Sequence, residues 1–228
     1  MRPPPGTVLR YPPFSRFNHW VTAVCMVLLV MSGLAFFYPW LYWLTVFFGG
    51  GQMARATHPW IGVVLFISYA IMVVRFFRHN LPHRDDLRWL RALGHVASGR
   101  EELVPEVGRY NPGQKFVYWA NAFLILILLV TGIIIWDWYF YNWTTIEQKR
   151  VAVLIHSIAA FFTILVLILH VYSAIWVRGT MPAMTRGYVP VGWVYRHHRK
   201  WLRQEAELAA QGKPSAIAGA PAVRTDPR

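Results

Sequence analysis

Four histidines lie in or at the ends of long apolar stretches of the sequence: His19, His58, His156 and His170. A neutral imidazole nitrogen is a frequent metal ligand, and ionisable residues in such stretches usually face the interior of a helix bundle and carry a function. His156 and His170 are 14 residues apart, so on an α-helix they share a face to within about 40° and lie about 21 Å apart along the axis. One helix would therefore carry two imidazoles at different depths.

The elements that would position these histidines are four apolar helices. No Asp, Glu, Lys or Arg occurs in the runs 17–54, 56–74, 116–136 and 151–177. About 20 apolar residues cross the hydrocarbon core of a membrane, and a helix satisfies its own backbone hydrogen bonds there. We therefore predict an all-α integral membrane protein, a four-helix bundle with transmembrane helices at Trp20–Tyr38, Ala56–Phe76, Lys115–Trp136 and Val151–Val177.

The composition supports a membrane protein over other classes. Apolar residues make up 56% of the 228-residue chain and charged residues 14%, whereas soluble domains have about 25% charged residues. The high hydrophobicity excludes a disordered chain. The net charge of +13 raises the possibility of nucleic-acid binding, but the basic residues flank the apolar runs, so we expect no nucleic-acid partner. The single cysteine, Cys25, excludes an internal disulfide, a CxxC zinc site and a CxxCH haem attachment.

The distribution of Lys and Arg predicts the orientation of the helices. Three lie in residues 1–16, eight in 75–115 and nine from 178 onward, whereas the two remaining connections together hold three. The positive-inside rule then places the N-terminus, the C-terminus and the long middle loop in the cytoplasm. We expect residues 1–204 to form a single domain with a short interfacial helix near Pro39–Gly51, and residues 205–228 to be a disordered cytoplasmic tail.

This orientation sorts the four histidines into two pairs. The first helix starts on the inner side, the second starts on the outer side, and the fourth runs from outside to inside. His58 and His156 thus share the outer depth, and His19 and His170 share the inner depth. Two histidines on opposite faces of a flat macrocycle are the ligands of a b-type haem. A zinc site would need about four ligands at one level, so we predict two bis-histidine haems b.

Gly33 and the remaining histidines have plainer interpretations. Gly33 follows His19 by 14 residues, so it shares the face of His19 at the outer depth. Its missing side chain would let either a porphyrin or a neighbouring helix approach. The other five histidines lie in basic segments, and we expect them to be solvated surface residues: His79, His83, His95, His197 and His198.

Over residues 10–204 the chain resembles the cytochrome b (gamma) subunit of membrane-bound respiratory formate dehydrogenase. The stretches that carry the resemblance are His19–Trp20, Thr57–Pro59, Arg109–Lys115, Leu129–Trp136, Leu154–Ser157, Leu169–Gly179 and Arg196–Trp201. The resemblance implies the same two haem-binding pairs. It also implies that a quinone, menaquinone or ubiquinone, is reduced on the cytoplasmic side beside the inner haem, at residues that correspond to Asn111, Gly113, Gln114 and His170.

The resemblance implies partner subunits as well. A periplasmic iron–sulfur beta subunit would deliver electrons to the outer haem, and they would pass through the inner haem to the quinone. Formate would be oxidised at the molybdenum or tungsten centre of an alpha subunit, and this chain would have no catalytic residue for that reaction. A chain with one cysteine cannot ligate iron–sulfur clusters itself. It would be a multi-pass protein of the bacterial inner membrane, surrounded by lipid.

Two other functions remain open at this point. A di-haem cytochrome b can also serve another quinone-linked oxidoreductase, of the hydrogenase or thiosulfate reductase type, and the copurifying subunits would distinguish these enzymes. A haem-free membrane anchor or transporter would use its histidines for helix packing. A dithionite-reduced minus oxidised spectrum without b-type bands would indicate that second class.

Overall fold

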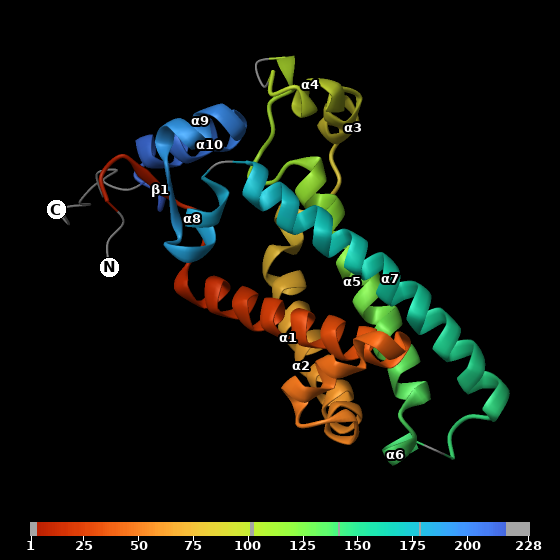
Figure 1. Ribbon diagram of the computed structural model, residues 1–228. Helices are drawn as coiled ribbons and strands as arrows, with labels where there is room; N and C mark the ends of the chain where they lie inside the picture. Colours follow the sequence, from red (N-terminus) through yellow and green to blue (C-terminus); the bar gives the residue numbers. More distant parts are fainter. Residues whose placement is uncertain (1–3, 101–102, 141, 178, 218–228) are drawn as a thin grey trace. The chain divides into compact units, whose positions relative to one another are not determined.

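The computed structural model describes residues 4–100, 103–140, 142–177 and 179–217 (Figure 1). The chain divides into two compact units. The spanning unit comprises Phe17–Phe77 and Val117–Tyr172. The terminal unit comprises Met1–Arg16, Arg78–Phe116 and Ser173–Arg228, and thus holds both chain ends. That the two units together form a single domain stays a prediction.

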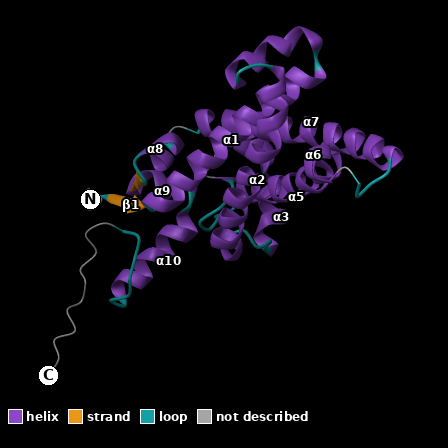
Figure 2. Cartoon of the chain, turned by 90° about the horizontal axis from the view of Figure 1, so that it is seen from below, coloured by secondary structure: helices purple, strands orange, loops and turns teal. Residues whose placement is uncertain are grey.

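Four long helices dominate the structure, and Figure 2 shows how little of the chain is strand. Each is long and apolar enough to cross a membrane, which confirms the four predicted transmembrane candidates. Each begins several residues earlier than predicted, because the residues ahead of each apolar run also adopt helical conformation. These helices are α1 (Pro13–Phe37), α2 (Gly51–Phe76), α5 (Pro112–Ile135) and α7 (Ile146–Trp176).

The predicted short helix before α2 is the 3₁₀ helix η1 (Pro39–Phe48). It ends at Gly49 and Gly50, whose φ angles of 83° and 102° are accessible to glycine. A Cβ on the next residue, Gly51, would collide with the Tyr42 hydroxyl. The three glycines therefore let the chain turn from η1 directly into α2.

The predicted helix start at Ala56 would place Pro59 in the first turn of α2. In the structure Pro59 lies inside the helix. The helix already begins at Gly51, so Pro59 interrupts an established helix. Proline has no N–H, and the carbonyl of Arg55 therefore lacks its usual helical donor.

Polar side chains join neighbouring helices inside the spanning unit. Between α1 and α2, Asn18 Nδ2 donates to the Ser68 carbonyl at 2.8 Å, and the Thr22 and Ser68 hydroxyls lie 2.7 Å apart. Between α2 and α5, the Tyr69 hydroxyl donates to the Tyr118 carbonyl at 2.7 Å. Such bonds matter in a membrane, because lipid tails provide no hydrophobic drive for helix association.

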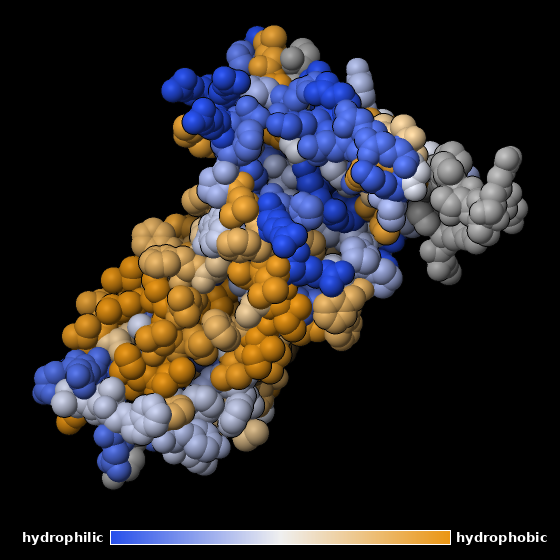
Figure 3. All heavy atoms as spheres, turned by 180° about the vertical axis from the view of Figure 1, so that it is seen from behind, coloured by the Kyte–Doolittle hydropathy of each residue, from blue (hydrophilic) through white to orange (hydrophobic). Residues whose placement is uncertain are grey.

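Apolar side chains fill the interior of the spanning unit and also cover its exterior. The buried cluster consists of Cys25, Met26, Leu65, Tyr69 and Ile125. Figure 3 shows hydrophobic residues over the visible face of this unit, and Val74 on α2 is 80% exposed. A soluble protein rarely exposes so continuous an apolar surface, so this exterior is suited to lipid.

A two-stranded antiparallel sheet organises the terminal unit. β1 (Thr7–Leu9) pairs with β2 (Tyr188–Pro190), with Val8 opposite Val189. The protein is therefore mostly helical, as predicted, with a small sheet in this unit that the all-α prediction did not include. Each strand has three residues, which is too short for a period of two to be recognised in the sequence.

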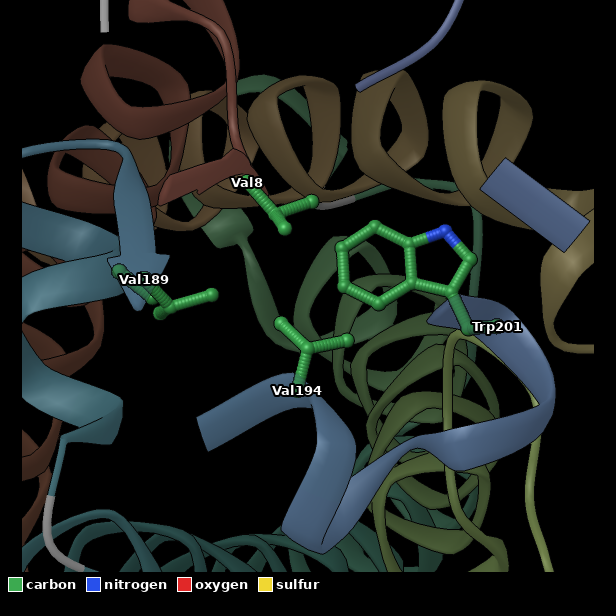
Figure 4. Close-up of a cluster of buried hydrophobic side chains, with 5 residues drawn as sticks. Val8, Val189, Val194 and Trp201 are labelled. Carbon is green, nitrogen blue, oxygen red and sulfur yellow. The ribbon is translucent and has the colours of Figure 1, made fainter. Parts of the chain in front are cut away.

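The helices α8 (Thr180–Thr185) and α9 (Val191–His197) pack against this sheet, and α10 (Arg199–Ala210) packs against α9. Val8, Val189, Val194 and Trp201 point toward one another from β1, β2, α9 and α10 and form the core of the unit (Figure 4). The short helices of the described chain, of which α6 belongs to the spanning unit, are η2 (Phe77–His79), α3 (Arg84–Arg91), α4 (Leu93–Ala97), α6 (Asp137–Phe140), α8 (Thr180–Thr185), α9 (Val191–His197) and α10 (Arg199–Ala210).

The ordered part of the C-terminal region extends beyond residue 204, where we expected a disordered tail to begin. Residues 205–210 belong to α10. Glu205 accepts hydrogen bonds from Trp201 Nε1 at 2.9 Å and from the Ala216 N–H at 2.7 Å, and Ile217 forms a bridge with Val8. Residues 218–228 lie outside the described residues.

Candidate functional site

His19 on α1 and His170 on α7 lie close together in the spanning unit, where His19 is partly buried and His170 is exposed. Their ring centroids are 6.2 Å apart, and the ring planes are inclined by 54°. Metal–imidazole bonds of about 2 Å, with each ring centroid about 1 Å farther out, would separate two opposed imidazoles by about 6 Å. The two rings thus have the spacing of opposed ligands of one metal ion.

His58 on α2 is held against α1. Its Nδ1 lies 2.6 Å from Ser32 Oγ, and its ring packs edge-on against Phe36 with centroids 5.6 Å apart. A Cβ on Gly33 would lie 3.9 Å from Cε1 of His58. Gly33 is therefore beside His58, as its spacing from His19 led us to expect.

His156 on α7 is held against α5 in the same way. Its Nδ1 lies 2.8 Å from Thr131 Oγ1. The next residue, Gly132, also lies against the ring, since a Cβ there would be 3.6 Å from Cε1 of His156. Both histidines of the predicted outer pair thus meet a hydroxyl followed by a glycine.

The structure brings His58 into the neighbourhood of His156, and His19 into that of His170. Within the described ranges, no group of three or more His, Cys, Asp or Glu side chains could hold a metal ion. The role of the four histidines as iron ligands stays a prediction.

A flat macrocycle fits these surroundings better than a bare metal ion. Each level offers two imidazoles, whereas a protein-bound zinc ion needs about four ligands. Haem brings its own nitrogen ligands, so the protein would need to supply only histidines to hold its iron. Gly33 and Gly132 present backbone without side chains beside the rings, and Nδ1 of His19 is buried with no hydrogen-bond partner in the described part of the chain. The donor set and the space beside it therefore suit haem b.

The three residues predicted to bind quinone before helix α5 form the start of that helix in the terminal unit. The Asn111 side-chain oxygen accepts from the Gln114 N–H at 2.9 Å, and the Gln114 side-chain oxygen accepts from the Asn111 N–H at 3.0 Å. This reciprocal capping box encloses Gly113 and uses both amide oxygens but neither NH₂ group. His170, the fourth predicted quinone residue, belongs to the spanning unit, so the complete quinone site stays a prediction.

A buried arginine and a buried histidine support the segment that leads into α5. Arg10 is 2% exposed; its Cζ lies 5.2 Å from the Trp201 ring centroid, and its Nη2 donates to the Arg109 carbonyl at 3.0 Å. His198 is 1% exposed, and its Nδ1 lies 2.8 Å from the Gly108 carbonyl oxygen. Burial and the nearby Arg10 lower the pKa of His198 well below its ordinary value. The expectation that His198 is a solvated surface residue was therefore wrong.

The sequence analysis also missed Ser32 and Thr131. Both lie in the middle of apolar runs, where a hydroxyl commonly bonds a carbonyl of its own helix and so carries no evident function. The available signal was the repeated dipeptide, Ser32-Gly33 and Thr131-Gly132. Its meaning depends on a neighbouring helix, which the sequence does not show.

Four apolar helices that bring histidines together in pairs define a multi-pass membrane protein of the cytochrome b class. Residues 10–187 match the family described as prokaryotic cytochrome b561. The chain belongs to this family, among the cytochrome b subunits of formate dehydrogenases. A b-type haem is the cofactor that this family implies.

Alignments with named formate dehydrogenase subunits cover most of the chain. The chain is 43% identical over 198 residues to the formate dehydrogenase cytochrome b556(fdo) subunit of Escherichia coli K12. The aligned region covers 87% of this chain and 93% of that subunit. It is 40% identical over 200 residues to the nitrate-inducible formate dehydrogenase cytochrome b556(Fdn) subunit of the same strain, covering 88% and 92%. The formate dehydrogenase cytochrome b556 subunit of Haemophilus influenzae is 36% identical over 198 residues, covering 87% and 83%.

Proposed function

We propose that this chain is the membrane electron-transfer subunit of a respiratory formate dehydrogenase, passing electrons from an iron–sulfur partner subunit to a quinone. The observation that carries the proposal is the 6.2 Å separation of the His19 and His170 ring centroids in the spanning unit. The neighbourhood of His58 and His156 supports it. Family membership and the formate dehydrogenase relatives support the choice of enzyme.

Two haems b would be held by these pairs, the outer one by His58 and His156 and the inner one by His19 and His170. When bound, haem b supplies reversible one-electron oxidation and reduction of its iron. The protein would contribute the imidazoles that hold the iron and the apolar helices that position them. With two histidine ligands rather than Met and His, the potentials would be comparatively low.

The proposed orientation places both chain ends in the cytoplasm of a bacterium and the four helices in its inner membrane. The support is the distribution of charge, since the three segments of the terminal unit carry most of the Lys and Arg residues. Electrons would then enter on the periplasmic side at the His58/His156 level and leave on the cytoplasmic side at the His19/His170 level.

The quinone would be bound on the cytoplasmic side by Asn111, Gly113, Gln114 and His170. The capping box leaves the NH₂ groups of Asn111 and Gln114 to donate toward quinone carbonyl oxygens. Gly113 between them has no side chain, which allows a ligand to approach the backbone. The quinone would take up two electrons from the His19/His170 level and two protons from the cytoplasm, and would leave as quinol.

The remaining chemistry would belong to partner subunits. The single cysteine of this chain cannot ligate iron–sulfur clusters. We therefore assign the clusters to a beta subunit and formate oxidation, which releases carbon dioxide, one proton and two electrons, to an alpha subunit with molybdenum or tungsten.

The test is purification of the complex from its native membrane through a tag on this chain. We expect b-type bands in the dithionite-reduced minus oxidised spectrum, two haems per chain by pyridine haemochrome, iron–sulfur and molybdenum or tungsten in the eluate, and quinol formation driven by formate. A chain without b-type bands would overturn the haem assignment. A di-haem complex that reduces quinone with hydrogen but not with formate would overturn the choice of enzyme.

A further inference from the structure

We propose that Ser32 and Thr131 are positioning residues: they fix the tautomer of His58 and His156 and thereby lower the redox potential of the haem that this pair holds. The inference rests on the proposed function, because it takes the two histidines as iron ligands. It concerns two hydroxyls on α1 and α5 to which sequence reasoning assigned no role.

On α1, the Ser32 hydroxyl has a carbonyl acceptor in its own helix as well as the imidazole of His58. Ser32 Oγ donates to the Leu28 carbonyl oxygen at 2.8 Å and lies 2.6 Å from Nδ1 of His58. With its proton directed to Leu28, the oxygen can only accept from the imidazole. Ser32 is 0% exposed, so no bulk water replaces it as the partner of Nδ1.

On α5, Thr131 repeats this arrangement. Its Oγ1 donates to the Ile127 carbonyl oxygen at 2.6 Å and lies 2.8 Å from Nδ1 of His156. Thr131 is 5% exposed. Each histidine of the pair therefore meets one buried hydroxyl, supplied in each case by a different neighbouring helix.

We infer from these contacts the tautomer with the imidazole proton on Nδ1 in both rings, in which each hydroxyl donates to its own helix and accepts from Nδ1–H. A neutral imidazole has one N–H, so its Nε2 keeps a lone pair and is the nitrogen that can bind iron. Donation from Nδ1–H to an oxygen makes the ligand more basic and fixes the orientation of the ring. A more basic ligand favours the oxidised iron, and the potential of that haem falls.

The other histidine pair supplies an internal reference. Nδ1 of His19 is buried and has no hydrogen-bond partner within the described ranges. A hydroxyl like that of Ser32 therefore does not support His19, and changes at Ser32 or Thr131 should leave the potential of the haem at His19 and His170 unchanged.

Buried hydroxyls in membrane helices often bond only a carbonyl of their own helix, so the test needs a matched control. Thr163 on α7 provides it. It is 2% exposed, and its Oγ1 donates to the Ala159 carbonyl oxygen at 2.8 Å. Thr163→Val removes the same group from the helix that carries His156 without removing a contact to a histidine.

The experiment compares Thr131→Val, Thr131→Ser, Ser32→Ala, Ser32→Thr and Thr163→Val in the full complex, by potentiometric titration with absorbance and electron paramagnetic resonance detection. Valine keeps the shape of threonine and removes its hydroxyl. We expect Thr131→Val and Ser32→Ala to raise one midpoint potential and shift the g-values of the same haem, or to weaken its binding by about 10- to 100-fold. Thr131→Ser and Ser32→Thr should restore the wild-type values.

Unchanged potentials in both Thr131→Val and Ser32→Ala, with two haems retained, would overturn the inference while leaving the haem assignment intact. An equal shift in Thr163→Val would overturn it too, because the effect would then be general to buried hydroxyls. Failure of the proposed function looks different: the wild-type complex would lack b-type bands, or His58→Ala would keep both haems.

Discussion

The imidazole rings of His19 and His170 lie 6.2 Å apart, centroid to centroid, although one comes from the first and the other from the last of the four long helices. The same last helix, α7, also carries His156. One helix therefore contributes a histidine to each pair, and the two pairs differ in the helix that supplies the second ring.

Because each pair depends on its own histidine of α7, His156→Ala and His170→Ala should each remove a different haem. We expect one haem per chain by pyridine haemochrome in each variant, with different residual bands in the reduced minus oxidised spectrum. The double variant should bind none. Loss of both haems from one single variant, in a protein that keeps its helical circular dichroism, would contradict two separate sites.

The capping box separates a structural role of Gln114 from a role in quinone binding. Gln114→Glu keeps the side-chain oxygen that accepts from the Asn111 N–H but removes the NH₂ group. A lost hydrogen bond of about 1–1.5 kcal/mol predicts roughly a tenfold slower reoxidation of the reduced protein by a quinone analogue.

The readout for Gln114→Glu is stopped-flow absorbance, with thermal stability followed in parallel. Gln114→Ala loses both groups and should be slower and also less stable. A Gln114→Glu protein with the wild-type rate would show that this residue only caps α5.

Arg10 should be a principal stabilising residue of the terminal unit. Its guanidinium is buried against the rings of Trp193 and Trp201, at 5.3 and 5.2 Å, and bonds the Arg109 carbonyl. A desolvated cation–π contact of about 2 kcal/mol and a charged hydrogen bond of about 1.5 kcal/mol predict that Arg10→Ala costs roughly 3.5 kcal/mol. Hydrogen exchange of the β2 and α10 amides would measure it.

The control for Arg10→Ala is Arg203→Ala, which removes an exposed ion pair with Glu106. Such surface pairs contribute below about 1 kcal/mol. If the two variants lost equal protection from hydrogen exchange, the burial of Arg10 would add no stability to the terminal unit.

The terminal unit should lose stability as the pH falls below neutrality. Burial and Arg10 hold the pKa of His198 well below its ordinary 6.5, and burial and Arg196 lower the pKa of His197 to about 4. Below about pH 6.5 the unfolded chain binds protons that the folded chain does not, so the folding free energy falls. For His198 the slope is about 1.4 kcal/mol per pH unit.

Hydrogen exchange between pH 7.5 and pH 5, corrected for the intrinsic rate, would measure this loss. In His198→Asn, the side-chain NH₂ can still donate to the Gly108 carbonyl but does not titrate. This variant should flatten the profile, and an unchanged slope would show that His198 is not responsible.

The elements of the spanning unit were predictable because their signals are local. A charge-free run of about 20 residues can satisfy its backbone in a membrane only as a helix. Helical geometry then places His156 and His170 on one face of α7. The helix starts were less predictable, because Gly51–Arg55, which includes Gln52 and Arg55, joins α2 ahead of the charge-free run from residue 56.

The sequence by itself determined the four helices. The expected orientation, and with it the expected depths of the four histidines, also comes from the sequence alone. Only the tertiary structure decided that Ser32 and Thr131 meet His58 and His156, that Thr7–Leu9 pairs with Tyr188–Pro190, and that His198 is buried. The physical reason is that helix formation and membrane partitioning depend on neighbouring residues in the chain. Contacts between helices and strands depend on rotation and register, which distant residues set together.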